Sequence, residues 1–216
     1  MSRVLFVDTH LDWSNFSVAG HVRQIEKGTS VEMIWGCNLA SMKSDEPLFL
    51  SAHGSSTSSG SFKNAKSLAT LLKSSGLPVT HKTLIFLTCS AAVDPKIKGV
   101  DSFALDMKAQ LQGLGYKNID VTGGRGAVVV FPSGWVSVKK KMVSLAGAEQ
   151  DRLVLLHFRA LDYCKLLVKD AMSNPIAPVL QRTADEVAVT LSSFYADLET
   201  GFAGYLKPKA KAFVTH

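Results

Sequence analysis

The feature that most constrains the fold is the alternation of short apolar runs with helix-like patterns. Runs rich in Val, Ile, Leu and Phe occur at residues 3–8, 31–36, 47–53 and 83–89. Each is shorter than a typical helix and is bounded by polar residues, Gly or Pro, as the buried strands of parallel sheets are. Between the last two runs, residues 62–76 carry apolar side chains at helical spacing and end in Gly76. This order of strand, helix and strand predicts an α/β fold with a mostly parallel central sheet.

The same pattern continues to about residue 140. Residues 102–115 form another helical stripe, in which Phe103, Met107, Leu111 and Leu114 share one face. The run at 118–123 predicts a further strand. Residues 124–140 predict a β-hairpin, because Pro132-Ser133-Gly134 supplies a turn between two apolar segments. These elements extend the predicted sheet but add no second domain.

The C-terminal third has a different character. Residues 149–172 and 179–199 carry two long helical patterns, separated by the Pro-containing segment "NPIAP". We therefore expect an α/β domain over residues 1–145 and a helical hairpin over residues 146–216. The apolar stripes of the hairpin need a partner surface, so it should pack on the first domain or beside it.

Composition and charge narrow the classes of partner. Of 216 residues, 46% are hydrophobic and 19% are charged, which favours a folded globular chain over a disordered one. A net charge of +6 permits binding to nucleic acid, acidic membranes or other polyanions. The charge is scattered, however, and only Lys139–Lys141 and residues 207–213 form clusters. We expect these clusters to be solvated surface, and we expect no specific nucleic-acid partner.

The cysteines and the N-terminus bear on compartment and metal content. Cys37, Cys89 and Cys164 are too few and too irregularly spaced for a disulfide framework or a zinc site, so we expect no metal and no cofactor. Reduced thiols indicate a reducing compartment. The N-terminus lacks the pattern of a signal peptide, and no run approaches the ~20 apolar residues of a membrane span. We therefore expect a cytoplasmic protein, whose delivery out of the cell would need another route.

Two of the predicted strands end in chemically active side chains. His53 follows one apolar run and Cys89 follows the next, 36 residues later. In an open α/β sheet, ligands bind beyond the carboxyl ends of the strands. If these two strands are neighbours, the imidazole can take the proton of the thiol and activate it as a nucleophile. The pair therefore predicts a Cys–His dyad.

The residues after His53 suit such a site. Gly54 lets a substrate carbonyl approach the backbone, and the N–H groups of Gly54 and Cys89 could hold an oxyanion. The segment "GSSTSSGS" that begins at Gly54 has only small side chains, which leaves room for an extended peptide.

These segments resemble a known family. "LFLSAHG", which ends at Gly54, and "LIFLTCSAA", which contains Cys89, are similar to the paired blocks of the caspase-like cysteine peptidases of clan CD. The closest likeness is to the self-processing cysteine protease domains of bacterial toxins, and "VTGGRGAVVV" resembles the segment that follows the cysteine in those domains. The resemblance covers roughly residues 1–140 and implies a three-layer sandwich of helices about a mostly parallel sheet. It implies a thiol protease of bacterial type, with His53 as general base, Cys89 as nucleophile and Gly54 in the oxyanion hole.

The resemblance has further implications and one departure. The toxin domains carry an acid that orients the histidine, and Asp8 is the positional candidate here. They also bind inositol hexakisphosphate, so Lys139, Lys140 and Lys141 are candidates for a polyanion activator. A peptide or protein is the implied substrate, and delivery as an effector is the implied setting. Thr88, before the cysteine, departs from the Ala or Ser of many relatives.

Three alternatives stay open at this point. The chain could be a non-catalytic member that uses the same fold as an interaction module. It could perform other thiol or phosphate chemistry, such as acyl transfer or nucleotide binding at the Ser/Gly segment. Cys37, which also follows a predicted strand, is a competing nucleophile, and a histidine or cysteine at a strand end is often structural.

Overall fold

A mostly parallel sheet forms the centre of the molecule. The computed structural model describes residues 1–93, 101–131, 134–138, 151–202 and 213–216. Its main sheet has the order β2-β1-β3-β4-β5-β8. The strands are β1 (Arg3–Phe6), β2 (Ser30–Met33), β3 (Leu48–Ser51), β4 (Thr83–Leu87), β5 (Asp120–Gly124) and β8 (Phe213–Thr215). The first five run parallel, and β8 pairs antiparallel with β5. The predicted α/β class and mostly parallel sheet are confirmed.

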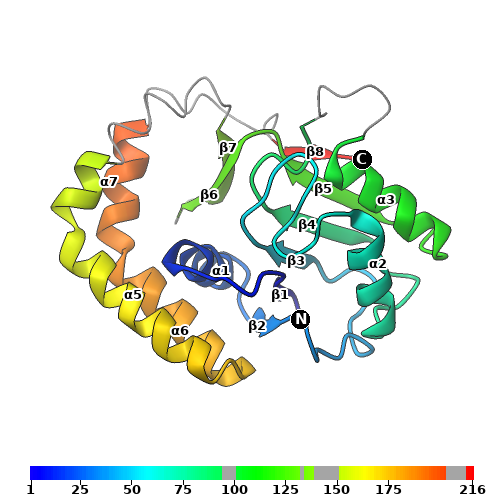
Figure 1. Cartoon of the computed structure of the whole chain (residues 1–216), viewed down its shortest axis with the longest axis horizontal. Coiled ribbons are helices and arrows are strands. Elements are labelled where there is room, and N and C mark those ends of the chain that lie inside the picture. The colour runs from blue at the N-terminus through cyan, green and yellow to red at the C-terminus, as the bar shows by residue number, and fades with distance from the viewer. Residues whose placement is uncertain (94–100, 132–133, 139–150, 203–212) are drawn as a thin grey trace.

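Helices cover both faces of this sheet, which makes three layers (Figure 1). Helices α2 (Ala65–Ser74) and α3 (Phe103–Gly113) lie on one face, and α1 (Trp13–Ile25) lies on the other. Adjacent strand residues point to opposite faces. Val4 and Phe6 accordingly pack in the core beneath α1, whereas Leu5 packs in the core beneath α2 and α3. Burial on both faces explains why the strands are continuous apolar runs rather than alternating ones.

The strands end earlier than the apolar runs predicted. The third run ends as a strand at Ser51 and the fourth at Leu87, so His53 and Cys89 lie in the loops that follow. Helix α2 also falls within its predicted range. It begins after Asn64, whose side chain accepts a hydrogen bond from the Ser67 N–H at 2.9 Å, and the chain turns at Gly76, where φ is +88°.

Sequence patterning did not predict α1 or β8. The buried face of α1 includes Asn15, Ser17, Gly20 and His21, which interrupt the apolar stripe that would have announced a helix. Strand β8 is only three residues long and begins at Phe213, the last residue of the basic segment 207–213 that we expected to be solvated surface. Its pairing partner supplies the stability that so short a segment lacks by itself.

The C-terminal helices share a core with the sheet. The structure has α5 (Phe158–Ser173), α6 (Ala177–Thr190) and α7 (Ser192–Phe202), so the second predicted helix is divided at Leu191. Helix α6 packs against α1 and β2. Phe16 and Phe49 lie in the same apolar cluster as Val168 and Ala184. These core residues lie on both sides of residue 145, the boundary that we expected.

The predicted hairpin is present as a separate two-stranded ribbon. Its strands are β6 (Ala127–Phe131) and β7 (Gly134–Val138), which pair antiparallel. Pro132 and Ser133 of the expected turn lie outside the described residues. In the described part of the chain, no helix is long and apolar enough to cross a membrane.

Gly20 lies where α1 and α6 approach each other closely. A Cβ on Gly20 would lie 2.1 Å from the Ala184 carbonyl oxygen, a backbone atom that cannot move independently of α6. We expect Gly20→Ala to destabilise the fold by about 1–3 kcal/mol, because overpacking outweighs the higher helix propensity of alanine. Urea unfolding would measure this change.

Gly113 is the matched control. It also lies in a helix, but nothing lies within 4 Å of the position that its Cβ would occupy. Gly113→Ala should therefore stabilise the protein by about 0.5–1 kcal/mol. Equal and favourable effects of both substitutions would mean that α1 and α6 are not in contact in solution.

Candidate active site

The two predicted residues follow neighbouring strands. Strands β3 and β4 are parallel partners, and Ser51 lies opposite Leu87. His53 and Cys89 each come two residues after that pair. A Cβ on Gly54 would lie 2.3 Å from Thr88 Cγ2, so the backbone after the histidine lies directly against the residue before the cysteine. The structure therefore places His53, Gly54 and Cys89 at one edge of the sheet, in adjacent loops.

The serine-rich segment after His53 is closed on itself. The Ser55 N–H donates to the Ser58 carbonyl at 3.0 Å, and the Gly60 N–H donates to the His53 carbonyl at 2.7 Å. Ser59 is buried, and its hydroxyl lies 3.0 Å from Thr88 Oγ1. We expected small residues that leave room for a peptide. Instead they form a compact turn that pins the histidine loop to Thr88, which accounts for the threonine before Cys89.

The turn that carries Cys89 is anchored on the other side. The Ser90 N–H donates to the Gly126 carbonyl at 2.7 Å, and the Ala92 N–H donates to the Gly124 carbonyl at 3.0 Å. Ser90 has a φ of 59°, a left-handed conformation that is uncommon for a residue other than glycine. Cys89 itself is half-buried and has a free thiol. Anchoring a strained turn next to a partly exposed thiol is typical of functional sites.

His53 is held by a carboxylate from the start of α1. Its Nε2 lies 3.1 Å from Asp12 Oδ2. The other oxygen of Asp12 caps the helix, accepting from the Ser14 N–H at 2.8 Å and from the Asn15 N–H at 3.3 Å. One carboxylate therefore both begins α1 and orients the imidazole.

The contact between His53 and Asp12 shifts the pKa values of both side chains. The hydrogen bond to Asp12 raises the pKa of His53 above its ordinary value, against partial burial, and the charge of Asp8 adds to the effect. Partial burial opposes ionisation of Asp12, but hydrogen bonds from His53 and Ser14 outweigh it and lower the Asp12 pKa to about 2. The stabilisation from His53 is complete below the ordinary histidine pKa and is lost as pH rises through the raised value. That from Asp12 is lost as pH falls through about 2, so the ion pair is intact in mildly acidic solution.

The orienting acid is Asp12 rather than the expected Asp8. Asp8 Oδ1 accepts hydrogen bonds from the His10 N–H at 3.1 Å and from the Ser61 hydroxyl at 3.4 Å. Asp8 acts on His53 only through its charge. We expected Asp8 because it ends the first apolar run. The chain continues for four more residues, to Asp12, before a carboxylate reaches the imidazole. The signal that could have found Asp12 is "DWSN", an Asp followed three residues later by Asn at a helix start.

Two backbone donors at the site are unused. Within the described part of the chain, neither the Gly54 N–H nor the Cys89 N–H donates a hydrogen bond to a protein group. Unpaired donors at a partly exposed edge are free to bind a developing oxyanion.

The other two cysteines do not follow β3 or β4. Cys37 follows β2 at the edge of the sheet, and burial raises the pKa of its thiol. Cys164 is buried in α5, where burial raises its pKa to about 11. Lys139–Lys141 lie outside the described residues. Among the described residues, no group of His, Cys, Asp and Glu side chains could hold a metal ion.

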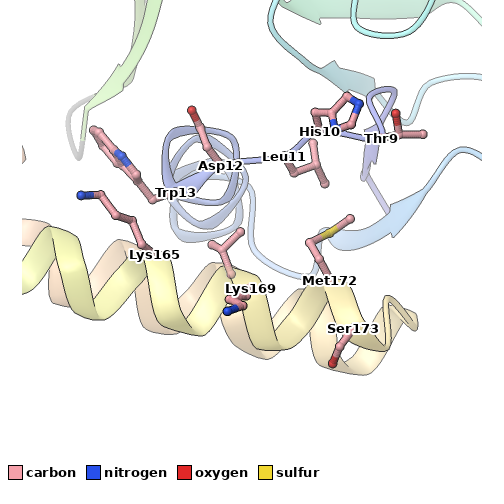
Figure 2. Close-up of a pocket in the computed structure, with 10 residues that line it drawn as sticks. Thr9, His10, Leu11, Asp12, Trp13, Lys165, Lys169, Met172 and Ser173 are labelled. Carbon is pink, nitrogen blue, oxygen red and sulfur yellow. The ribbon is translucent and has the colours of Figure 1, made fainter.

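A groove adjoins the site on the side of α5 (Figure 2). It has a volume of about 660 Å³. One wall is the loop at residues 9–13, which contains Asp12, and the other is α5, from Lys165 to Ser173. Figure 2 shows the Asp12 carboxylate pointing away from α5. Asp12 both lines the groove and contacts His53, so it connects the groove with the candidate site. Sequence reasoning did not identify this groove, because its two walls are more than 150 residues apart.

Comparison with known proteins assigns this chain to no family. No protein-family model matches the chain, and a search of curated proteins finds no match. The functional argument therefore starts from the residues at the sheet edge.

Proposed function

We propose that the chain is a caspase-like cysteine peptidase, in which Cys89 is the nucleophile and His53 transfers protons. The observation that carries this proposal is the hydrogen bond between His53 Nε2 and Asp12, next to the loop that bears Cys89. A histidine with a purely structural role is usually buried. His53 instead lies at an exposed edge, beside an acid that raises its pKa. His53 is 55% exposed and Asp12 is 49% exposed, so both are accessible to a substrate.

The hydrogen-bonding pattern assigns a task to each ring nitrogen. Nε2 is committed to Asp12, which leaves Nδ1 to exchange a proton with the thiol. A raised pKa favours the imidazolium form of His53. In the proposed reaction, Nδ1 holds the proton of the Cys89 thiol when the nucleophile forms, while Asp12 holds the ring in place.

The reaction follows from these assignments. The Cys89 thiolate attacks the carbonyl carbon of the scissile peptide bond, and the oxyanion that forms binds the N–H groups of Gly54 and Cys89. As the C–N bond breaks, the leaving amine takes the proton from His53 Nδ1. Neutral His53 then removes a proton from water, which attacks the thioester. The C–S bond of the thioester then breaks, the acid product leaves, and Cys89 is released as the thiolate. His53 keeps the proton that it took from water, so the starting charges are restored.

Alkylation of Cys89 as a function of pH tests the proposal. In the wild-type protein, iodoacetamide should label Cys89 rapidly at neutral pH, faster than Cys37 or Cys164. His53→Ala should slow that labelling roughly tenfold or more, since an unassisted thiol ionises only near pH ~8.5. Asp12→Asn should have a smaller effect in the same direction, because the histidine loses the charge that raises its pKa but the helix keeps a capping residue. Mass spectrometry of tryptic peptides would locate and time the label.

The pH dependence of Cys89 labelling distinguishes a thiol assisted by His53 from an unassisted one. Wild type and variants should converge above about pH 9, where any accessible thiol is ionised. Labelling of Cys89 that is slow at neutral pH and unchanged by either substitution would contradict the dyad. That result would favour a caspase-like interaction module without catalysis.

A further inference from the structure

The groove beside the candidate site is lined on one wall by lysines. Lys165 and Lys169 lie one turn apart on α5, and both contribute to the lining. Figure 2 shows Lys165 rising from α5 towards Trp13 on the opposite wall. Residues four apart in a helix lie on the same side of it, so both lysines add positive charge to this wall. Figure 2 shows the Lys169 amine against α5, further from the opposite wall than that of Lys165.

Little negative charge inside the groove compensates these lysines. Lys165 bonds to Asp162 at 2.7 Å, but both side chains are highly exposed, and such a surface pair is weak and easily exchanged. No ion pair of Lys169 occurs among the described residues. Asp12 also borders the groove, but its charge is engaged by His53 and by the N-terminus of α1. The groove therefore attracts a carboxylate.

The remaining lining is largely apolar. Leu11 and Trp13 stand on the loop wall, and Val168 and Met172 stand on α5. Trp13 is packed edge-on against Phe194, which fixes its orientation. A volume of about 660 Å³ is within the range of binding sites for small ligands or a few peptide residues. A ligand that fits this surface combines acidic groups with apolar ones.

We propose that this groove is a recognition subsite for an acidic, partly apolar segment of an extended peptide substrate. The inference rests on the proposed peptidase function, because the segment would enter the site past Asp12. Lys165 and Lys169 would bind Asp or Glu side chains of the substrate, and Leu11, Trp13 and Met172 would contact its apolar side chains. The subsite belongs to the C-terminal helices, so those helices would select the substrate while the sheet edge supplies the chemistry.

Peptide binding to the Cys89→Ala chain tests the subsite without turnover. The probe is a fluorescein-labelled peptide in which Glu alternates with Val, compared with the same peptide carrying Gln. At low ionic strength, fluorescence anisotropy should show tighter binding of the Glu peptide. Lys165→Gln and Lys169→Gln should each weaken it by up to about fivefold, the range of an exposed ion pair. Lys169→Glu should weaken the Glu peptide further and strengthen a Lys-containing peptide.

Matched variants locate the effect. Lys63→Gln combined with Lys66→Gln removes two exposed lysines at the start of α2, on the other face of the sheet, and should leave binding unchanged. Tryptophan emission should change when the Glu peptide binds, and this change should disappear in Trp13→Phe.

Three results would overturn the subsite. They are equal affinity for the Glu and Gln peptides, indifference to both lysine substitutions, and displacement of the peptide by dilute inorganic phosphate, which would indicate a site for small anions. If His53-dependent labelling of Cys89 persists in the same preparations, only the subsite fails and the proposed peptidase stands. If that labelling is also absent, the proposed function fails independently of the groove.

Discussion

On the proposed mechanism, Cys89→Ala should reduce peptide hydrolysis by roughly 10⁴-fold or more, because Cys89 is the group that attacks the scissile bond. His53→Ala should cost nearly as much, since the two side chains act as a unit and their losses are not additive. The double variant should therefore be no less active than Cys89→Ala alone. Initial rates on a mixed peptide library, read by mass spectrometry of the products, would measure all three.

Cys37→Ala is the control for this experiment. Cys37 is also a free, half-buried thiol after a strand, but it follows the edge strand β2 rather than the strand next to His53. Its removal should leave hydrolysis within about twofold of wild type, as expected for a substitution away from the site. Loss of activity in Cys37→Ala together with retention in Cys89→Ala would transfer the nucleophile to Cys37 and refute the proposed site.

Gly54→Ala should lower hydrolysis by roughly 10²–10³-fold, the usual cost of losing an oxyanion donor. A Cβ at this position would lie 2.3 Å from Thr88 Cγ2 and 2.5 Å from the Ser58 carbonyl oxygen, so the loop must shift. The Ser58 contact is with backbone and cannot be relieved by a side-chain rotation. The shift would move the Gly54 N–H away from the oxyanion that we propose it binds together with the Cys89 N–H.

A second substitution distinguishes the loss of the oxyanion donor from a general loss of stability. Thr88→Ser removes Cγ2 but keeps the hydroxyl that bonds Ser59. Combined with Gly54→Ala, it should restore part of the activity and leave the clash with Ser58. Thermal unfolding of each variant shows whether the fold is retained. If Gly54→Ala is stable and fully active, Gly54 is not part of an oxyanion hole.

The sheet and the positions of His53 and Cys89 after its strands could be predicted because both depend on local burial. Strands that are buried on both faces must be continuous apolar runs, so residues 3–8, 47–53 and 83–89 predicted β1, β3 and β4 directly. His53 and Cys89 interrupt two such runs at their carboxyl ends. A polar side chain at the end of an apolar run can be recognised in the sequence, independently of the rest of the fold.

The partner of His53 depends on tertiary structure. Asp8 and Asp12 both follow β1. The "DWSN" pattern marks Asp12 as a helix cap, but it does not show that the carboxylate reaches a histidine 41 residues away. The path of the chain into α1 decides it. That helix was hard to predict because its buried face carries Asn15, Ser17 and His21.

Sequence alone thus determined the α/β class, the mostly parallel sheet and the two side chains after the strand ends, because periodic burial is recorded residue by residue. Tertiary structure decided that Asp12 orients His53, that Thr88 and Ser59 tie the two loops together, and that α5 closes a lysine-lined groove beside them. These features depend on contacts between polar side chains far apart in the chain. Such contacts leave no periodic signal, since their free energy comes from a geometry that exists only after the core has formed.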